Sequence, residues 1–202
     1  MEINSEVIRG CEITNEGTTC FIMRAENGDA FKVYKNALGY IAGNSEYDMD
    51  EGYVMGRLSH IVSQRDSVKK TQLPSDILFC NGKAVGIKMP YYENAQTLRD
   101  YLISNPDVDL GEVKNEVHGI VGELIEHGIV PTDPHFENFL VTFDENGKRK
   151  LNMVDVDDHY VSVYPEGAKR GLSYDIDVST CYRVIDLSIE DVNSKRNGSI
   201  HN

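Results

Sequence analysis

The sequence predicts an α+β fold in which a β-rich region, residues 1–89, precedes a helical region, residues 94–192. Short strand-like runs bounded by tight turns fill the first region. The longest helical periodicity of the chain lies in the second region, over residues 110–125. Residues 90–93 leave the last strand and form the expected hinge between the two regions, and the polar residues 193–202 are expected to be a disordered tail.

The hydrophobic fraction, net charge and cysteine pattern of the chain disfavour some classes of function. The chain has 202 residues, of which 40% are hydrophobic, enough for one domain or two tightly joined lobes. Its formal net charge of −13 opposes binding to nucleic acid or to an anionic membrane surface. The four cysteines are scattered without a C-x-x-C pair, so free thiols in a reducing compartment are expected.

The first residues contain neither a basic leader nor an apolar signal segment, and no apolar run reaches the length of a membrane span. We therefore expect a cytoplasmic protein. Secretion into a host cell without a cleavable signal peptide would leave no signal in the sequence, so it stays an alternative.

The β-rich region is expected to begin with three strands and a helix. The strands are predicted over residues 7–13, 20–23 and 30–35. Alternation in the third strand places Lys32 on the face opposite Phe31 and Val33. Residues 45–64 then have helical spacing.

Glu51 lies on the apolar stripe of that predicted helix, four residues before Met55. A buried carboxylate is costly unless it is paired, so Lys32 is the expected partner. The alternative is that Glu51 lies at the edge of the stripe and reaches water.

A hairpin and two helices follow. Residues 77–80 and 84–89 are predicted to be strands joined by an Asn-Gly turn. One helix is expected from Thr97 to Ile103. A longer one is capped by Asp109 and ended by Gly128.

Two acidic centres follow that long helix. Asp133 and Asn138 precede a strand-like run, and Asp155 ends a second run after a turn of the Asn-Gly type, residues 144–148. We therefore expect Asp133, Asn138 and Asp155 to gather at one end of a small hairpin. Their oxygen atoms suit Mg²⁺, or a base beside it.

This order of residues resembles the catalytic centre of the protein-kinase-like fold, in which an Asp, an Asn five positions later and a metal-binding Asp flank a hairpin. Lys32, after Ala30-Phe31, resembles the lysine of the family's third strand. The residues around Glu51 resemble its helix C. The sequence departs from the family at Pro131-Thr132, where His-Arg is usual, and at Val156-Asp157, where Phe-Gly is usual.

The resemblance implies a small β-rich N-lobe, a truncated helical C-lobe, and ATP and Mg²⁺ as cofactors. It assigns Asp133 as catalytic base, Lys32 held by Glu51 as the phosphate-binding lysine, and Asn138 and Asp155 as metal ligands. Nucleotide-binding positions are implied at Gly17, Lys32, Met89 and Tyr91.

The resemblance favours a Mg²⁺- and ATP-dependent phosphotransferase, a minimal protein Ser/Thr kinase similar to secreted bacterial effector kinases. It covers nearly the whole chain but lacks the helices that normally follow helix F. A protein substrate and an activating protein partner are then expected, with neither nucleic acid nor membrane. The alternatives are a small-molecule kinase of the aminoglycoside or choline type, and a pseudokinase that serves as a binding module.

Overall fold

The computed structural model is an α+β protein with antiparallel sheets. It describes residues 1–16, 19–25, 28–43, 51–156, 161–164 and 171–198, without the side chains of residues 51–53 and 198. The chain forms two compact units. Unit 1 comprises Met1–Arg65 and Gln72–Tyr91, and unit 2 comprises Asp66–Thr71 and Tyr92–Asn202.

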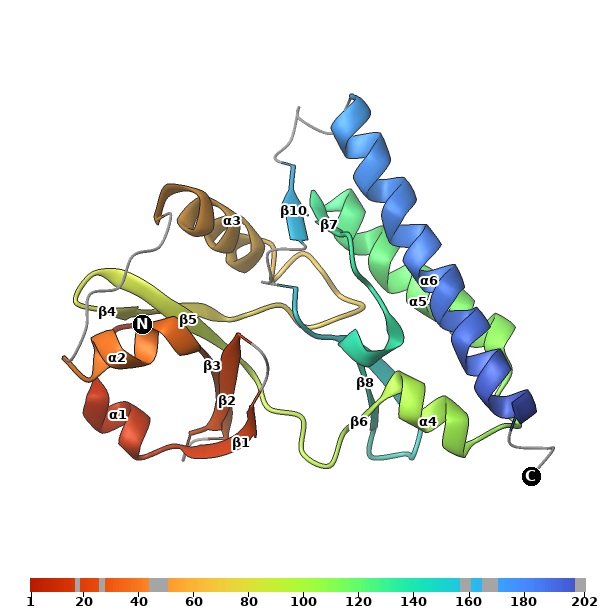
Figure 1. Ribbon diagram of the computed structural model, residues 1–202, viewed down its shortest axis with the longest axis horizontal. Coiled ribbons are helices and arrows are strands. Elements are labelled where there is room, and N and C mark those ends of the chain that lie inside the picture. The colour runs from red at the N-terminus through yellow and green to blue at the C-terminus, as the bar shows by residue number, and fades with distance from the viewer. Residues whose placement is uncertain (17–18, 26–27, 44–50, 157–160, 165–170, 199–202) are drawn as a thin grey trace. The chain divides into compact units, whose positions relative to one another are not determined.

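Unit 1 is built on a five-stranded antiparallel sheet with the order β1-β2-β3-β5-β4 (Figure 1). Its strands are β1 (Glu12–Glu16), β2 (Cys20–Arg24), β3 (Asp29–Tyr34), β4 (Asp76–Cys80) and β5 (Lys83–Pro90). Asn81 and Gly82 both have positive φ, 48° and 80°, which is the geometry that an Asn-Gly hairpin turn requires. The predicted β4–β5 hairpin is thereby confirmed.

Apolar side chains cover both faces of this sheet. Phe31, Val33 and Val85 belong to one cluster, to which residues of α2 (Leu38–Ile41) also belong. Leu58 of α3 (Glu51–Ser63) packs with Ile77, Ala84 and Ile87 in a second cluster. The central strands are therefore buried between two layers of side chains.

The first predicted strand was placed too early. Residues Ser5–Arg9 form a helix, α1, because the Asn4 side chain accepts hydrogen bonds from the N–H groups of Glu6 and Val7, at 3.0 and 3.1 Å. Strand β1 begins only at Glu12. A local cap therefore overrides the strand propensity of Val7-Ile8.

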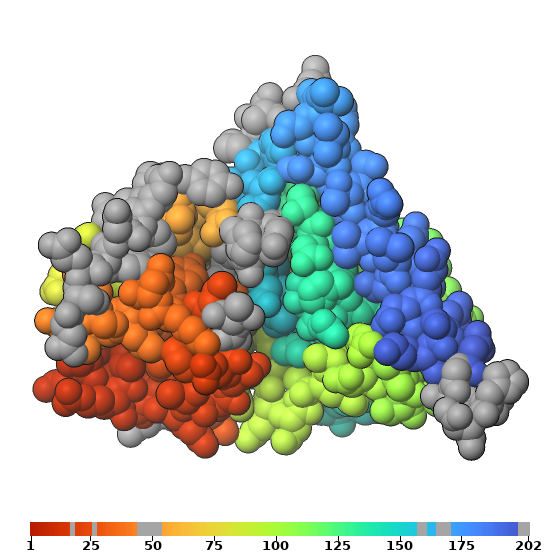
Figure 2. Space-filling model, in the orientation of Figure 1, coloured from red at the N-terminus to blue at the C-terminus, as the bar shows by residue number. Residues whose placement is uncertain are grey.

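The described part of unit 2 contains two small sheets and three α-helices. Strands β6 (Gln96–Thr97), β8 (Phe139–Phe143) and β9 (Arg149–Met153) form one sheet, and β7 (Ile129–Pro131) pairs with β10 (Val161–Val163). The helices are α4 (Leu98–Ser104), α5 (Leu110–Glu126) and α6 (Leu172–Gly198), and a 3-10 turn, η2, spans Phe136–Asn138. Helices α5 and α6 lie side by side (Figure 1), and α6 is visible along its length at the surface of unit 2 in Figure 2.

Local signals set the ends of the first two of these helices. Thr97 caps α4 by accepting the Asp100 N–H at 3.1 Å, and Asp109 caps α5 by accepting the Gly111 N–H at 2.6 Å. Gly128, just past α5, has a φ of 74°. These features confirm the predicted starts of both helices.

Helix α6 is longer than the sequence predicted. It continues past Leu187 to Gly198, so residues 193–198 are helical, not a disordered tail. The Arg196 guanidinium donates to the carbonyl oxygens of Leu102, Asn105 and Val108, each at 3.0 Å. These contacts tie the last turns of α6 to the end of α4 and the loop that follows it.

Residues Asp66–Thr71 belong to unit 2, although the sequence placed them in the first region. The N–H groups of Lys69 and Lys70 donate to the Glu123 carboxylate, at 3.0 and 2.6 Å. The Thr71 hydroxyl accepts the Met153 N–H at 2.9 Å. The segment is therefore held against α5 and β9.

No helix in the described part of the chain is long and apolar enough to cross a membrane.

Candidate functional site

The site begins in unit 2, where β7 leads into a tight turn at Asp133. The Asp133 carbonyl oxygen accepts two hydrogen bonds, from the His135 N–H and from the Asn138 side-chain amide, both at 3.0 Å. Phe136 and Phe139 anchor the turn, since their side chains are only 1% and 0% exposed. The backbone between Asp133 and Asn138 is thus fixed by both hydrogen bonds and burial.

The end of the β8–β9 hairpin joins the same turn. The Val154 N–H donates to the Asn138 carbonyl oxygen at 2.8 Å, and Phe139 pairs with Met153 across the hairpin. Asp155 follows Val154 directly. The structure therefore brings Asp133, Asn138 and Asp155 to one end of the hairpin, as the sequence predicted.

Asp155 has a φ of 59°, in the left-handed region that non-glycine residues seldom adopt. Such a conformation costs about 1–3 kcal/mol and persists only where surrounding structure holds it, frequently at functional sites. The strain falls on the residue that the sequence selected as a metal ligand.

Ionisable side chains lie near the turn at Asp133. The His135 Nε2 atom lies 3.6 Å from the Asp133 carboxylate, and the Nδ1 atom lies 3.9 Å from Glu137. Arg99 lies 2.9 Å from Asp191 and 3.8 Å from Glu137. The hydrogen bond to Asp191 is the main cause of the raised pKa of Arg99.

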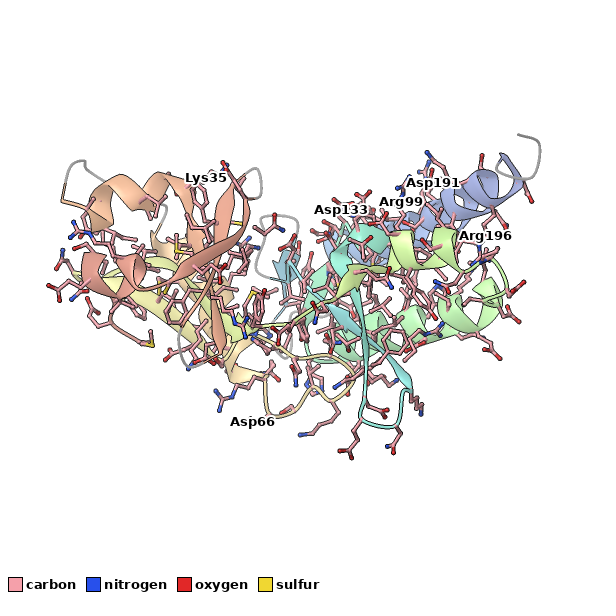
Figure 3. All side chains as sticks on the ribbon, turned by 90° about the horizontal axis from the view of Figure 1, so that it is seen from below. Lys35, Asp66, Arg99, Asp133, Asp191 and Arg196 are labelled. Carbon is pink, nitrogen blue, oxygen red and sulfur yellow. The ribbon has the colours of Figure 1, made fainter. Side chains whose placement is uncertain are left out.

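A cavity of about 370 Å³ opens beside these residues. Its apolar wall comes from Phe136, Val184 and Leu187, and Glu137 and Asp191 contribute carboxylates. Figure 3 shows the labelled Asp133, Arg99 and Asp191 on the same side of unit 2. His135 also lines the cavity and lies 3.6 Å from the Asp133 carboxylate, which is 38% exposed.

The side chains of Asp133, Asn138 and Asp155 suit a magnesium ion whose remaining ligands are water and substrate phosphates. In the described residues no three His, Cys, Asp or Glu side chains gather closely enough to bind a metal. Asp133, Asn138 and Asp155 offer two carboxylates and one amide. Mg²⁺ is commonly bound by one or two carboxylates together with water and substrate phosphates, so the set fits that ion.

In unit 1, Lys32 lies on the central strand β3 and is 3% exposed. It pairs with Ile87 of β5, and directly opposed residues of an antiparallel pair project from the same face. Because Ile87 packs with Leu58 of α3, Lys32 is on the face that α3 covers. Glu51 is the first residue of α3, but its side chain is outside the described residues, so the Lys32–Glu51 pair stays a prediction.

Two of the implied nucleotide-binding positions lie at the end of β5, Met89 within the strand and Tyr91 just after it. Met89 pairs with Ala30, and the Arg24 guanidinium lies over the Tyr91 ring, 4.8 Å from its centre. The chain passes from unit 1 to unit 2 after Tyr91. Gly17 lies outside the described residues.

Sequence reasoning left His135 unassigned and missed Arg99 and Asp191. His135 sits between Asp133 and Glu137 in the sequence, and this proximity was the only available signal. Arg99 and Asp191 meet across α4 and α6, and no local pattern reports such a contact.

Compared with protein-family models and with curated proteins, the chain matches none of them. What is known of the site therefore comes from its own residues.

Proposed function

We propose that the chain is a Mg²⁺- and ATP-dependent phosphotransferase with a kinase-like bilobal fold, and specifically a minimal protein Ser/Thr kinase. The observation that carries the proposal is the gathering of Asp133, Asn138 and the strained Asp155 at one end of the β8–β9 hairpin. In kinases, an arrangement of this kind binds the metal and orients the attacking hydroxyl.

The proposed roles follow from the chemistry of the side chains. Asp155 and Asn138 would hold Mg²⁺, which would neutralise negative charge on the phosphates of ATP. Asp133 accepts the proton of the acceptor hydroxyl as general base. Lys32 neutralises phosphate charge. Positioning and charge neutralisation then supply most of the catalysis.

Unit 1 supports the proposal independently. A lysine that is 3% exposed on a central strand is rare unless its charge is used or paired. Lys32 lies on the sheet face covered by α3, the helix that begins at Glu51. This placement is the one expected of a phosphate-binding lysine oriented by a glutamate.

One observation favours a second candidate, a small-molecule kinase. The cavity beside Asp133 has the size of a small-ligand site, about 370 Å³, and Glu137 and Asp191 line it. Arg99 also lines the cavity and lies beside both carboxylates, so one negative charge remains in excess. This excess would favour a cationic acceptor, as in the aminoglycoside or choline type of phosphotransferase.

The decisive experiment incubates the protein with γ-labelled ATP and Mg²⁺, together with a cell lysate or a panel of small hydroxylated amines. Asp133→Ala should abolish transfer while Mg²⁺-ATP still raises the melting temperature. Asp155→Ala should lose both transfer and the Mg²⁺-dependent shift. Asp107→Ala, at an exposed loop position, is the matched control and should behave as wild type.

The outcomes separate the candidates. Label on a protein band supports the protein kinase, and label on an amine only supports the small-molecule kinase. The absence of both label and thermal shift supports the pseudokinase, and a thermal shift without label indicates a missing activating partner or a different transfer chemistry. Transfer that persists at wild-type rate in Asp133→Ala would remove the assigned base.

A further inference from the structure

A second concave site of unit 2 lies away from Asp133. It has a volume of about 460 Å³ and is formed by the Asp66–Thr71 segment, one side of α5 and the turn between β8 and β9. Asp66 and Asp133 are at opposite sides of unit 2 in the view of Figure 3. This second site is therefore distinct from the proposed catalytic one.

The lining of this cavity is strongly basic. Five cationic residues line it, together with two acidic residues, Glu116 and Asp144. The cations are Lys69, Lys70, Lys148, Arg149 and Lys150. This local excess of positive charge contrasts with the net charge of −13 of the whole chain.

Both carboxylates of the lining already have partners. Glu116 accepts a hydrogen bond from Arg149 at 2.8 Å. Asp144 accepts the N–H groups of Asn146 and Lys148, at 2.9 and 2.8 Å, and so closes the hairpin turn. Two carboxylates cannot balance five cationic residues, so the lining of the cavity has an excess of positive charge.

Two of the cations are held in place by the fold. Glu123 binds the backbone N–H groups of Lys69 and Lys70, which fixes the segment that carries them. The Lys70 ammonium donates to the Gly119 carbonyl oxygen at 3.1 Å, and a Cβ atom at Gly119 would lie only 3.3 Å from it. The lack of a side chain at Gly119 thus lets Lys70 lie against α5.

Arg149 retains unused hydrogen-bonding capacity. One of its terminal nitrogens binds Glu116, but its Nε atom is buried and has no hydrogen-bond partner in the described structure. The guanidinium also lies 6.0 Å from the centre of the Tyr101 ring. Guanidinium groups bind phosphate through two parallel N–H donors.

We propose that this basic cavity, lined by Lys69, Lys70, Lys148, Arg149 and Lys150, binds a small molecule with two or more phosphate groups. The volume is within the range of small-ligand sites. The acidic remainder of the chain would repel an extended polyanion such as nucleic acid. The site does not depend on the proposed phosphotransfer.

The test uses isothermal titration calorimetry of the full chain with pyrophosphate and with inositol hexakisphosphate, without ATP or Mg²⁺. We expect at least one probe to bind, and its affinity to fall on raising NaCl from 0.1 to 0.5 M. The double variant Lys148→Gln/Lys150→Gln should weaken binding about tenfold, because each exposed charge contributes a modest attraction. The single variant Lys150→Gln removes one exposed charge and should weaken binding of the probe about threefold.

Arg183→Gln/Lys195→Gln removes two exposed charges from α6 and is the matched control, for which wild-type affinity is expected. Asp155→Ala should also retain binding, since the proposed nucleotide site is elsewhere. Loss of binding in Asp155→Ala, equal weakening in the control, or no heat with either probe at millimolar concentration would overturn the proposal. Binding of a poly-glutamate peptide but of neither phosphorylated probe would also overturn it and indicate an acidic-peptide surface.

Discussion

At the scale of single residues, Asn138 connects the two halves of the candidate site. Its amide donates to the Asp133 carbonyl oxygen, and its own carbonyl oxygen accepts the Val154 N–H beside Asp155. A single residue thereby couples the turn after β7 to the end of the hairpin. If Asn138 also binds Mg²⁺, its amide oxygen is the available ligand, because its nitrogen is already used.

Because Cys181 is buried, we expect the stability of the folded protein to fall at alkaline pH. Its side chain is 0% exposed, and burial raises the pKa of its thiol from 9.0 to about 12. The folded state keeps the proton that the unfolded state releases above pH 9. This stabilisation is therefore complete below pH 9 and is lost as the pH rises towards 12.

At pH 10.5, Cys181 should lower the free energy of unfolding by about 2 kcal/mol relative to pH 8. Urea unfolding under reducing conditions at both pH values measures this loss. Cys181→Ala should be less stable at pH 8 but should show a smaller decline with pH. Parallel declines in wild type and variant would contradict the assignment.

At the scale of elements, the β3–β5 pairing depends on Gly86. A Cβ atom at this position would lie 2.2 Å from the Lys32 carbonyl oxygen, closer than any real contact allows. Close approach of the two strands here positions Lys32 and requires a residue without a side chain.

Gly86→Ala should destabilise the protein by at least about 2 kcal/mol, because β3 must shift to accommodate the methyl group. Gly56→Ala is the matched control. Gly56 lies within α3 with nothing within 4 Å of an added Cβ, so alanine should stabilise the protein by about 0.5–1 kcal/mol. Urea unfolding compares the two variants, and equal stabilities would refute the close contact at Gly86.

The end of α6 depends on Arg196, whose guanidinium binds three backbone carbonyl oxygens. Arg196→Ala should lower the free energy of unfolding by about 2–3 kcal/mol, since it leaves these acceptors without a charged donor. Arg196→Lys should not restore it, because an ammonium group cannot span three acceptors.

Hydrogen exchange provides the second readout for Arg196. Amides of residues 188–198 should exchange faster in Arg196→Ala than in wild type, whereas Ser194→Ala, at an exposed position of the same turn, should leave them unchanged. Unchanged exchange in Arg196→Ala would mean that the end of α6 is stable without this residue.

At the scale of the whole molecule, acidity is the dominant property. A net charge of −13 produces self-repulsion in the compact state, which salt screens. Raising NaCl from 20 to 300 mM at pH 7 should therefore raise the melting temperature by about 2–4 °C, equivalent to about 1 kcal/mol. Differential scanning calorimetry measures the shift.

The same salt titration near the isoelectric point is the control, since little net repulsion is left there to screen. A melting temperature that falls with salt at pH 7 would show that ion pairs such as Arg99–Asp191 outweigh the repulsion.

The sequence alone determined the α+β class and those elements whose ends carry local signals. Asn81-Gly82, Asp109 and Gly128 each specify a turn, a helix start or a helix end through backbone chemistry within a few residues. It also placed Asp133, Asn138 and Asp155 together, because a short hairpin leaves them few alternatives. The chemical roles of these residues, and the pairing of Lys32 with Glu51, stay predictions.

Only the tertiary structure decided the features that join distant segments. It assigned Asp66–Thr71 to unit 2, extended α6 to Gly198 and assembled the basic cavity around Arg149. Each depends on side chains that meet across long sequence separations, as when Arg196 binds the carbonyl oxygen of Leu102. Local propensity contains no information about such partners, because the stabilising contact exists only once the chain has folded.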